Sequence, residues 1–64
     1  MPVITLGIGQ VNEDQKRQLV EKLTAEAAAI TKMGVETFTV FIQEYPYENI
    51  GFGGKTVKDR KAGK

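Results

Sequence analysis

The group in this sequence best suited to acid–base chemistry is the amine that removal of Met1 would free on Pro2. The 64-residue chain contains no histidine and no cysteine, which leaves carboxylates, lysines, tyrosines and the amino terminus as candidate bases. Initiator methionine is normally trimmed when the next residue is small, as proline is. A terminal proline then carries a secondary amine in a rigid ring, so the backbone sets the direction of its lone pair.

An amine of this kind is suited to moving a proton next to a carbonyl group. A general base works best when its pKa lies near the working pH, and burial or a nearby cation lowers the pKa of an amine. A terminal amine walled by apolar groups therefore favours enol–keto proton transfer near neutral pH. Because many proteins begin with Met-Pro, Pro2 alone does not distinguish a base from an inert terminus, and retention of Met1 would leave its nitrogen an amide.

The composition favours assembly into an oligomer. A domain of this length buries only about 60% of the surface of its unfolded chain, and such domains usually add disulfides, a metal or partner subunits. Without cysteine or histidine, disulfides and Cys/His zinc sites are excluded. No loop has calcium-binding spacing either. We therefore expect one domain over residues 1–64, stabilised by other copies of itself, with no metal.

The sequence gives little support for partners other than a small-molecule substrate and further copies of the same chain. No apolar run reaches the roughly 20 residues that span a bilayer, and no signal peptide is recognisable, so we expect a cytoplasmic protein without a membrane partner. A net charge of +1 gives no general nucleic-acid signature, although residues 1–54 carry −3 and residues 55–64 carry +4. This basic C-terminal tail, residues 55–64, either binds anions, RNA or a neighbouring subunit, or is a partly disordered terminus.

The apolar pattern predicts a strand, a helix and a second strand. Residues 2–8 alternate as a strand does. Asn12 and Gln15 have the spacing of a capping box, and the helix they open runs to about residue 32, with Gly34 as its C-cap. Residues 38–43 form the second strand. One helical stripe is apolar, with Ala28 outside it; its members are Leu19, Val20, Leu23, Ala27 and Ile30.

This order defines an α/β fold, a single βαβ unit with parallel strands. Parallel sheets are covered on both faces, but one helix covers only one face. The other, with Val3, Thr5 and Phe41, therefore needs a second subunit. Glu44 and Glu48 are expected to lie in solvent.

The glycine-rich segment at residues 49–56 nearly matches a phosphate-binding loop. Asn49 stands where the first glycine is required, and only eight residues follow Thr56. That is too few for the phosphate-holding helix and the strand that accompanies it. The pattern favours a small hairpin or an adaptable loop, with a turn that uses glycines at positive φ.

Over nearly its whole length the chain resembles the 4-oxalocrotonate tautomerase family, within the tautomerase superfamily. The resemblance rests on Met1-Pro2 before the first strand and on residues 12–16, 42–44 and 49–54. It implies a βαβ subunit with a C-terminal hairpin, assembled as a symmetric hexamer with active sites at subunit boundaries. It also implies a cofactor-independent isomerase, of the kind used in aromatic compound catabolism. In such an enzyme Pro2 moves a proton between the enol oxygen and a carbon of a small 2-hydroxydienoate or enolpyruvate-type acid.

Both arginines that bind diacid substrates in this family are missing at their usual places. Residues 9–12 contain no cation, and alignment puts Thr39 at the second position. Thr39 can donate one hydrogen bond but cannot clamp a carboxylate in bidentate fashion. Ile50 replaces an aromatic wall beside Pro2. The substrate is then expected to carry one carboxylate or none, unless another cation substitutes; the candidates are Arg60, Lys16, Lys61, Arg17 and Lys55.

Two other functions remain open from the sequence. Superfamily members with the same proline include dehalogenases, hydratases and decarboxylases of small unsaturated acids, so kinship does not fix the reaction. The other possibility is a non-catalytic oligomer that binds an anion or nucleic acid through residues 55–64. The sequence sets neither the physiological substrate nor the number of subunits.

Overall fold

The computed structural model describes the backbone of residues 1–63 and the side chains of residues 1–61. Its elements in chain order are β1 (Val3–Ile8), α1 (Glu13–Thr31), the 3₁₀ turn η1 (Val35–Thr37), β2 (Thr39–Glu44), the 3₁₀ turn η2 (Tyr47–Asn49), β3 (Gly51–Phe52), β4 (Lys55–Thr56) and α2 (Val57–Gly63). Within these residues no helix is both long and apolar enough to cross a membrane.

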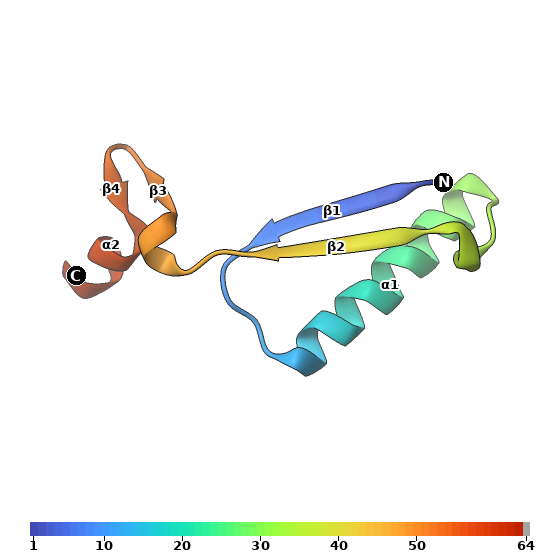
Figure 1. The fold of residues 1–64 in the computed structure, drawn as a ribbon, viewed down its shortest axis with the longest axis horizontal. Helices are drawn as coiled ribbons and strands as arrows, with labels where there is room; N and C mark the ends of the chain where they lie inside the picture. Colours follow the sequence, from blue (N-terminus) through green and yellow to red (C-terminus); the bar gives the residue numbers. More distant parts are fainter. Residues whose placement is uncertain (64) are drawn as a thin grey trace.

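The first three main elements form the expected βαβ unit. Strands β1 and β2 pair in parallel from Val3 opposite Thr39 to Ile8 opposite Glu44. The long helix α1 runs beside both strands and covers one face of the sheet (Figure 1). Alternate residues of β1, starting at Ile4, are half-buried on that face, as a strand with one covered side requires.

The capping box predicted at the start of α1 is confirmed. The Asn12 side chain accepts from the Gln15 N–H at 2.7 Å, and the Gln15 side chain accepts from the Asn12 N–H at 3.0 Å. The predicted C-cap at Gly34 is wrong. Lys32 takes the left-handed conformation with φ 64°, and its N–H donates to the Ala28 carbonyl. This closes the helix earlier and leaves Gly34 extended, to start the return toward β2.

The face of α1 that meets the sheet differs from the predicted stripe. Leu19 and Leu23 are half-buried as expected, but Val20 is 40% and Ile30 75% exposed. Ala28, predicted to lie outside the stripe, is the one buried residue among those described, at 7% exposure. A methyl side chain fits there because the helix lies close to the strands.

Residues 45–63 form a C-terminal arm that projects beyond the ends of β1 and β2, at the opposite end from the N-terminus (Figure 1). Strands β3 and β4 make the expected antiparallel hairpin, and Gly53 and Gly54 form its turn at φ 64° and 82°. The helix α2 follows directly, with the Val57 N–H donating to the Ile50 carbonyl at 2.7 Å. Most of the basic tail is therefore helical; Lys64 lies outside the described residues.

The chain by itself has almost no core. Its radius of gyration is 15.3 Å, whereas a compact domain of 64 residues has about 11 Å. The sheet face opposite α1 is open, with Val3 51% and Phe41 53% exposed. A single copy therefore leaves uncovered most of the apolar surface that would stabilise it.

Candidate active site

Pro2 lies at the head of the sheet, directly before β1. Its carbonyl accepts from the Thr39 N–H at 3.1 Å, which extends the pairing of β1 with β2 by one residue. Proline is tolerated at this position because a strand start does not need its missing N–H. The backbone on the carbonyl side of the pyrrolidine ring is thus held by the sheet.

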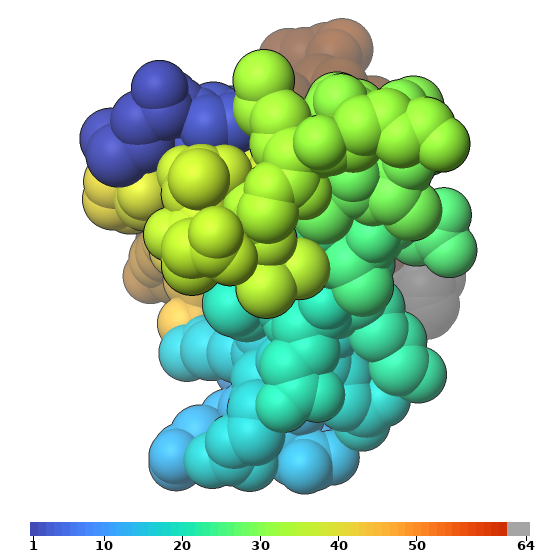
Figure 2. Space-filling model, turned by 90° about the vertical axis from the view of Figure 1, so that its right-hand side faces the viewer, coloured from blue at the N-terminus to red at the C-terminus, as the bar shows by residue number. Residues whose placement is uncertain are grey.

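The structure includes Met1, which is joined to the Pro2 nitrogen by a peptide bond. Its side chain is almost fully exposed, and its sulfur accepts from the Thr39 hydroxyl at 3.6 Å. Figure 2 shows the first residues at the surface, beside the connection between α1 and β2. Removal of Met1 would leave a secondary amine at this end of the sheet.

A shallow hollow opens at this end of the molecule. Its lining combines apolar side chains with one carboxylate; the residues are Met1, Pro2, Met33, Gly34, Glu36 and Thr37. The Glu36 carboxylate folds back over Gly34 so closely that a Cβ on Gly34 would collide with it. Sequence reasoning did not single out Glu36, because only the turn after α1 brings it to this end. A carboxylate near an amine favours the charged amine, whereas apolar walls favour the neutral one.

Two of the predicted site residues, Pro2 and Thr39, are neighbours in one chain. Two others, Ile50 and Arg60, lie in the C-terminal arm at the far end of the sheet (Figure 1). The six-residue strands between the two ends are each about 20 Å long. Ile50 and Arg60 therefore do not reach Pro2 of their own chain.

Arg60 is held within the arm by Phe52. The guanidinium carbon of Arg60 lies 4.4 Å from the centre of the Phe52 ring, and the group donates to the Phe52 carbonyl at 3.4 Å. Lys61 lies over the Tyr47 ring at 5.1 Å. Arg60 and Lys61 thus each lie over the face of an aromatic ring. Their charged groups are at the surface, where an anion can approach.

Lys16 forms an ion pair with Glu44, with 2.7 Å between its Nζ and Oε1 of the carboxylate. The second carboxylate oxygen accepts from the Val11 N–H at 2.9 Å. These bonds, with Lys16 the larger cause, hold the pKa of the Glu44 carboxyl below its ordinary value. Glu44 is solvent-exposed, as the sequence predicts, but its ion pair and its hydrogen bond were not predicted. Parallel pairing of the two strands places Glu44, at the end of β2, level with the loop after β1, and this placement could have predicted the contact.

The remaining predicted cations do not gather at Pro2. Arg17 pairs with Glu13 at 3.1 Å and with Asp14 at 3.6 Å along the surface of α1. Lys55 lies in the hairpin strand β4 of the arm. None of the described residues lining the Pro2 hollow is basic.

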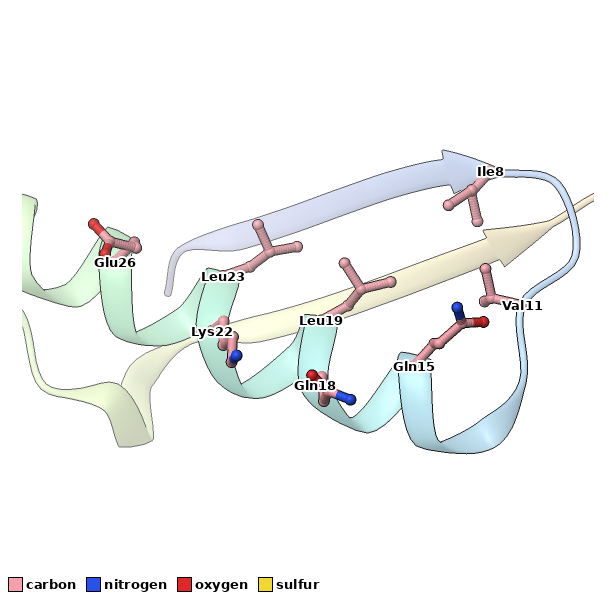
Figure 3. A pocket seen from close by; sticks show the side chains of 8 residues that line it. All are labelled: Ile8, Val11, Gln15, Gln18, Leu19, Lys22, Leu23 and Glu26. Atoms are coloured by element: carbon pink, nitrogen blue, oxygen red, sulfur yellow. The ribbon is translucent and has the colours of Figure 1, made fainter.

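A second hollow runs along α1 and is separate from the Pro2 site. Figure 3 shows Leu19 and Leu23 pointing from the helix toward the strands, with Gln18 and Lys22 on the outer side. Its lining contains none of the five predicted site residues; the members are Ile8, Val11, Gln15, Gln18, Leu19, Lys22, Leu23 and Glu26. This hollow is an apolar strip with a polar rim, and it lacks the terminal amine.

The chain is similar to proteins described as tautomerases. The family described as "Tautomerase enzyme" matches residues 3–60. A probable tautomerase from Bacillus cereus is 34% identical over 61 residues, which cover 94% of this chain and 100% of the relative. The chain therefore belongs to the tautomerase family.

Solved structures agree with this assignment. DmpI from Archaeoglobus fulgidus is 40% identical, with a TM-score of 0.83 over 91% of this chain and 100% of its own. A heterohexamer 4-oxalocrotonate tautomerase from Chloroflexus aurantiacus is 25% identical, with a TM-score of 0.86 over 92% of this chain and 97% of its own. The expected 4-oxalocrotonate tautomerase-like βαβ fold is thereby confirmed.

Proposed function

We propose that the protein is a cofactor-independent tautomerase whose base is the Pro2 amine after removal of Met1. The amine accepts the proton of the enol hydroxyl, the electrons shift along the conjugated system, and the ammonium returns the proton to carbon. The product is the keto isomer, and Pro2 ends the cycle neutral. The observation that carries this proposal is the anchoring of Pro2 at the head of β1, where the Thr39 N–H fixes its carbonyl.

The proposed enzyme is a homo-oligomer, and we favour a hexamer. Only Ala28 is buried among the described residues, and one face of the sheet is open. The related Chloroflexus aurantiacus protein is described as a heterohexamer. Contact between copies would cover the open face and bring the C-terminal arm of one subunit to Pro2 of another. Ile50 would then wall the cleft, and desolvation would lower the pKa of the Pro2 amine.

The proposed substrate is a small enol acid with one carboxylate. The described lining of the Pro2 hollow contains Glu36 and no cation, so a second carboxylate bound there would meet repulsion. Thr39 can donate one hydrogen bond to the enolate oxygen. Arg60 of a neighbouring subunit is the proposed partner of the single carboxylate, because its guanidinium is presented on the exposed Phe52 ring.

The test compares enol–keto conversion of an enolpyruvate-type mono-acid by the wild type and by Pro2→Ala. A well-placed general base contributes about 10²- to 10⁴-fold, so we expect kcat/KM to fall at least 100-fold. Intact mass measured on the same samples must show that Met1 is absent from the active protein. Equal activity of Pro2→Ala, or full activity with Met1 retained, would remove Pro2 from the mechanism.

The substrate and cofactor claims have their own controls. Arg60→Ala should raise KM for the mono-acid, whereas Arg17→Ala, a cation on the surface of α1, should not. Activity on 2-hydroxymuconate, a diacid, should be lower than on the mono-acid. Dialysis against a chelator should leave all of these rates unchanged.

One residue, Glu36, favours a second candidate reaction at this site, dehalogenation or hydration of an unsaturated acid. Dehalogenases and hydratases of this superfamily act on small unsaturated acids, and they require a carboxylate that activates water. Glu36 lines the hollow at Pro2 and is free of ion pairs to any described residue. Halide release from a halogenated unsaturated acid that is lost in Glu36→Gln, with enol–keto conversion retained, would support this alternative.

A further inference from the structure

Two chain segments leave the sheet at the same end and are tied together there. After Ile8 the chain passes through a loop, residues 9–12, into α1; after Glu44 it passes into the C-terminal arm. Ile8 and Glu44 are the last paired residues of the two parallel strands. The Tyr45 N–H continues this pairing by donating to the Ile8 carbonyl at 3.0 Å.

One carboxylate binds both the loop and the helix. Glu44 accepts from the Val11 N–H with Oε2 at 2.9 Å and pairs with Lys16 through Oε1 at 2.7 Å. The other ion pairs in the described part of the chain both lie within α1, four or three residues apart. The Glu44 pair is thus the one that joins separate elements.

The base of the C-terminal arm contacts the same loop through the Tyr47 side chain. A Cβ on Gly9 would lie 3.0 Å from Cε1 of Tyr47, so the Tyr47 ring rests directly on this glycine. On the arm side, Lys61 of α2 lies over the same ring at 5.1 Å. The base of the arm and the loop are therefore in direct contact.

We propose that Glu44 is a positioning residue that fixes residues 9–12 and thereby aims the C-terminal arm at the neighbouring subunit. The proposal rests on the proposed function, in which that arm delivers Ile50 and Arg60 to another subunit's Pro2. It assigns Lys16 a different role from the substrate contact predicted from the sequence. Lys16 acts through Glu44, and its charge is neutralised there by an ion pair instead of by a substrate carboxylate.

The first test is independent of catalysis. Amide exchange at Val11 reports whether its N–H is held, and loss of a charge-assisted hydrogen bond should speed that exchange about tenfold in Glu44→Ala. Glu44→Gln keeps a carbonyl acceptor and should give a smaller increase. The control Glu13→Gln breaks an ion pair of α1 that joins no other element, and exchange at Val11 should stay within about twofold of the wild type. Unchanged exchange in Glu44→Ala would overturn the proposal.

The second test is a double-mutant cycle on KM. If Lys16 acts only through Glu44, Lys16→Met and Glu44→Ala should each raise KM, and the double variant should equal Glu44→Ala alone. Lys16→Arg retains the ion pair and should restore the wild-type KM. The pH at which the proposed Pro2 base titrates should stay the same in all of them. Additive effects would show that Lys16 contacts the substrate itself and would refute the positioning role.

The two proposals fail in distinguishable ways. If Pro2→Ala retains full activity, the proposed mechanism is wrong, whatever the exchange at Val11 shows. If Pro2→Ala is inactive but the cycle at Lys16 and Glu44 leaves KM unchanged in every variant, the mechanism stands and the positioning role of Glu44 is wrong. Size-exclusion chromatography of each variant establishes that the same oligomer is compared, and Glu44→Gln serves where Glu44→Ala does not assemble.

Discussion

Truncation of Phe41 should weaken the assembly of subunits. Phe41 lies on the open face of the sheet and is 53% exposed in the single chain. An aromatic side chain buries about 150–250 Å², so roughly 80–130 Å² remains for a partner to cover. At about 25 cal/mol per Å² this corresponds to about 2–3 kcal/mol for each copy. The association constant should then fall about 30- to 150-fold for each contact that contains Phe41.

Sedimentation equilibrium over a range of concentrations measures this change in Phe41→Ala. Val20→Ala is the matched control, because Val20 is also exposed but lies on the outer side of α1. Four charged residues line the hollow around Val20; they are Glu13, Lys16, Arg17 and Glu21. If Phe41→Ala assembles as tightly as the wild type while its fold is intact, the open face is not an interface between subunits, and the reasoning from exposed area is wrong.

Four further outcomes are expected. Glu36→Gln should move the acidic limb of the pH–rate profile, where the Pro2 amine loses its proton, to lower pH, because loss of the carboxylate lowers the pKa of the terminal amine; Glu21→Gln, on the surface of α1, should not. The pKa of Glu44 lies below its ordinary value chiefly through Lys16, so its stabilising contribution is fully present above that ordinary value. It should be lost as the pH falls through the lowered pKa, and exchange at Val11, corrected for intrinsic rates, should quicken over that window. Gly54→Ala should destabilise the protein by about 1 kcal/mol, since Gly54 has φ 82°, whereas Gly54→Asn should cost less in thermal unfolding. The unfolding temperature of the wild type should rise with protein concentration, as for a protein whose folding depends on association.

Local signals were sufficient to predict the βαβ unit and the hairpin. The Asn12 capping box and the paired glycines of the hairpin turn act within a few residues, so neighbouring sequence determines them. The part of α1 that meets the sheet could not be predicted in the same way. Ala28 is buried while Ile30 is exposed because the crossing of helix and strands selects one side of a broad apolar stripe.

The candidate site was harder to predict because its residues are not local. Pro2 and Thr39 meet through the parallel register, which the strand order predicts. Glu36 reaches the same hollow only through the turn that follows α1. The two bonds of Glu44 depend on where the loop before α1 lies in space. Arg60 and Ile50 lie in an arm that does not fold back on its own sheet, so the role proposed for them depends on another copy.

The state of one nitrogen atom tests the mechanism most directly. The chain has two prolines, so ¹⁵N-proline labelling gives two signals, and Pro46 serves as an internal amide reference. In the assembled, active protein the Pro2 nitrogen should titrate as a secondary amine near neutral pH, together with the rate of enol–keto conversion. A Pro2 nitrogen signal that stays at an amide position across this pH range in the active protein would contradict proline-based catalysis.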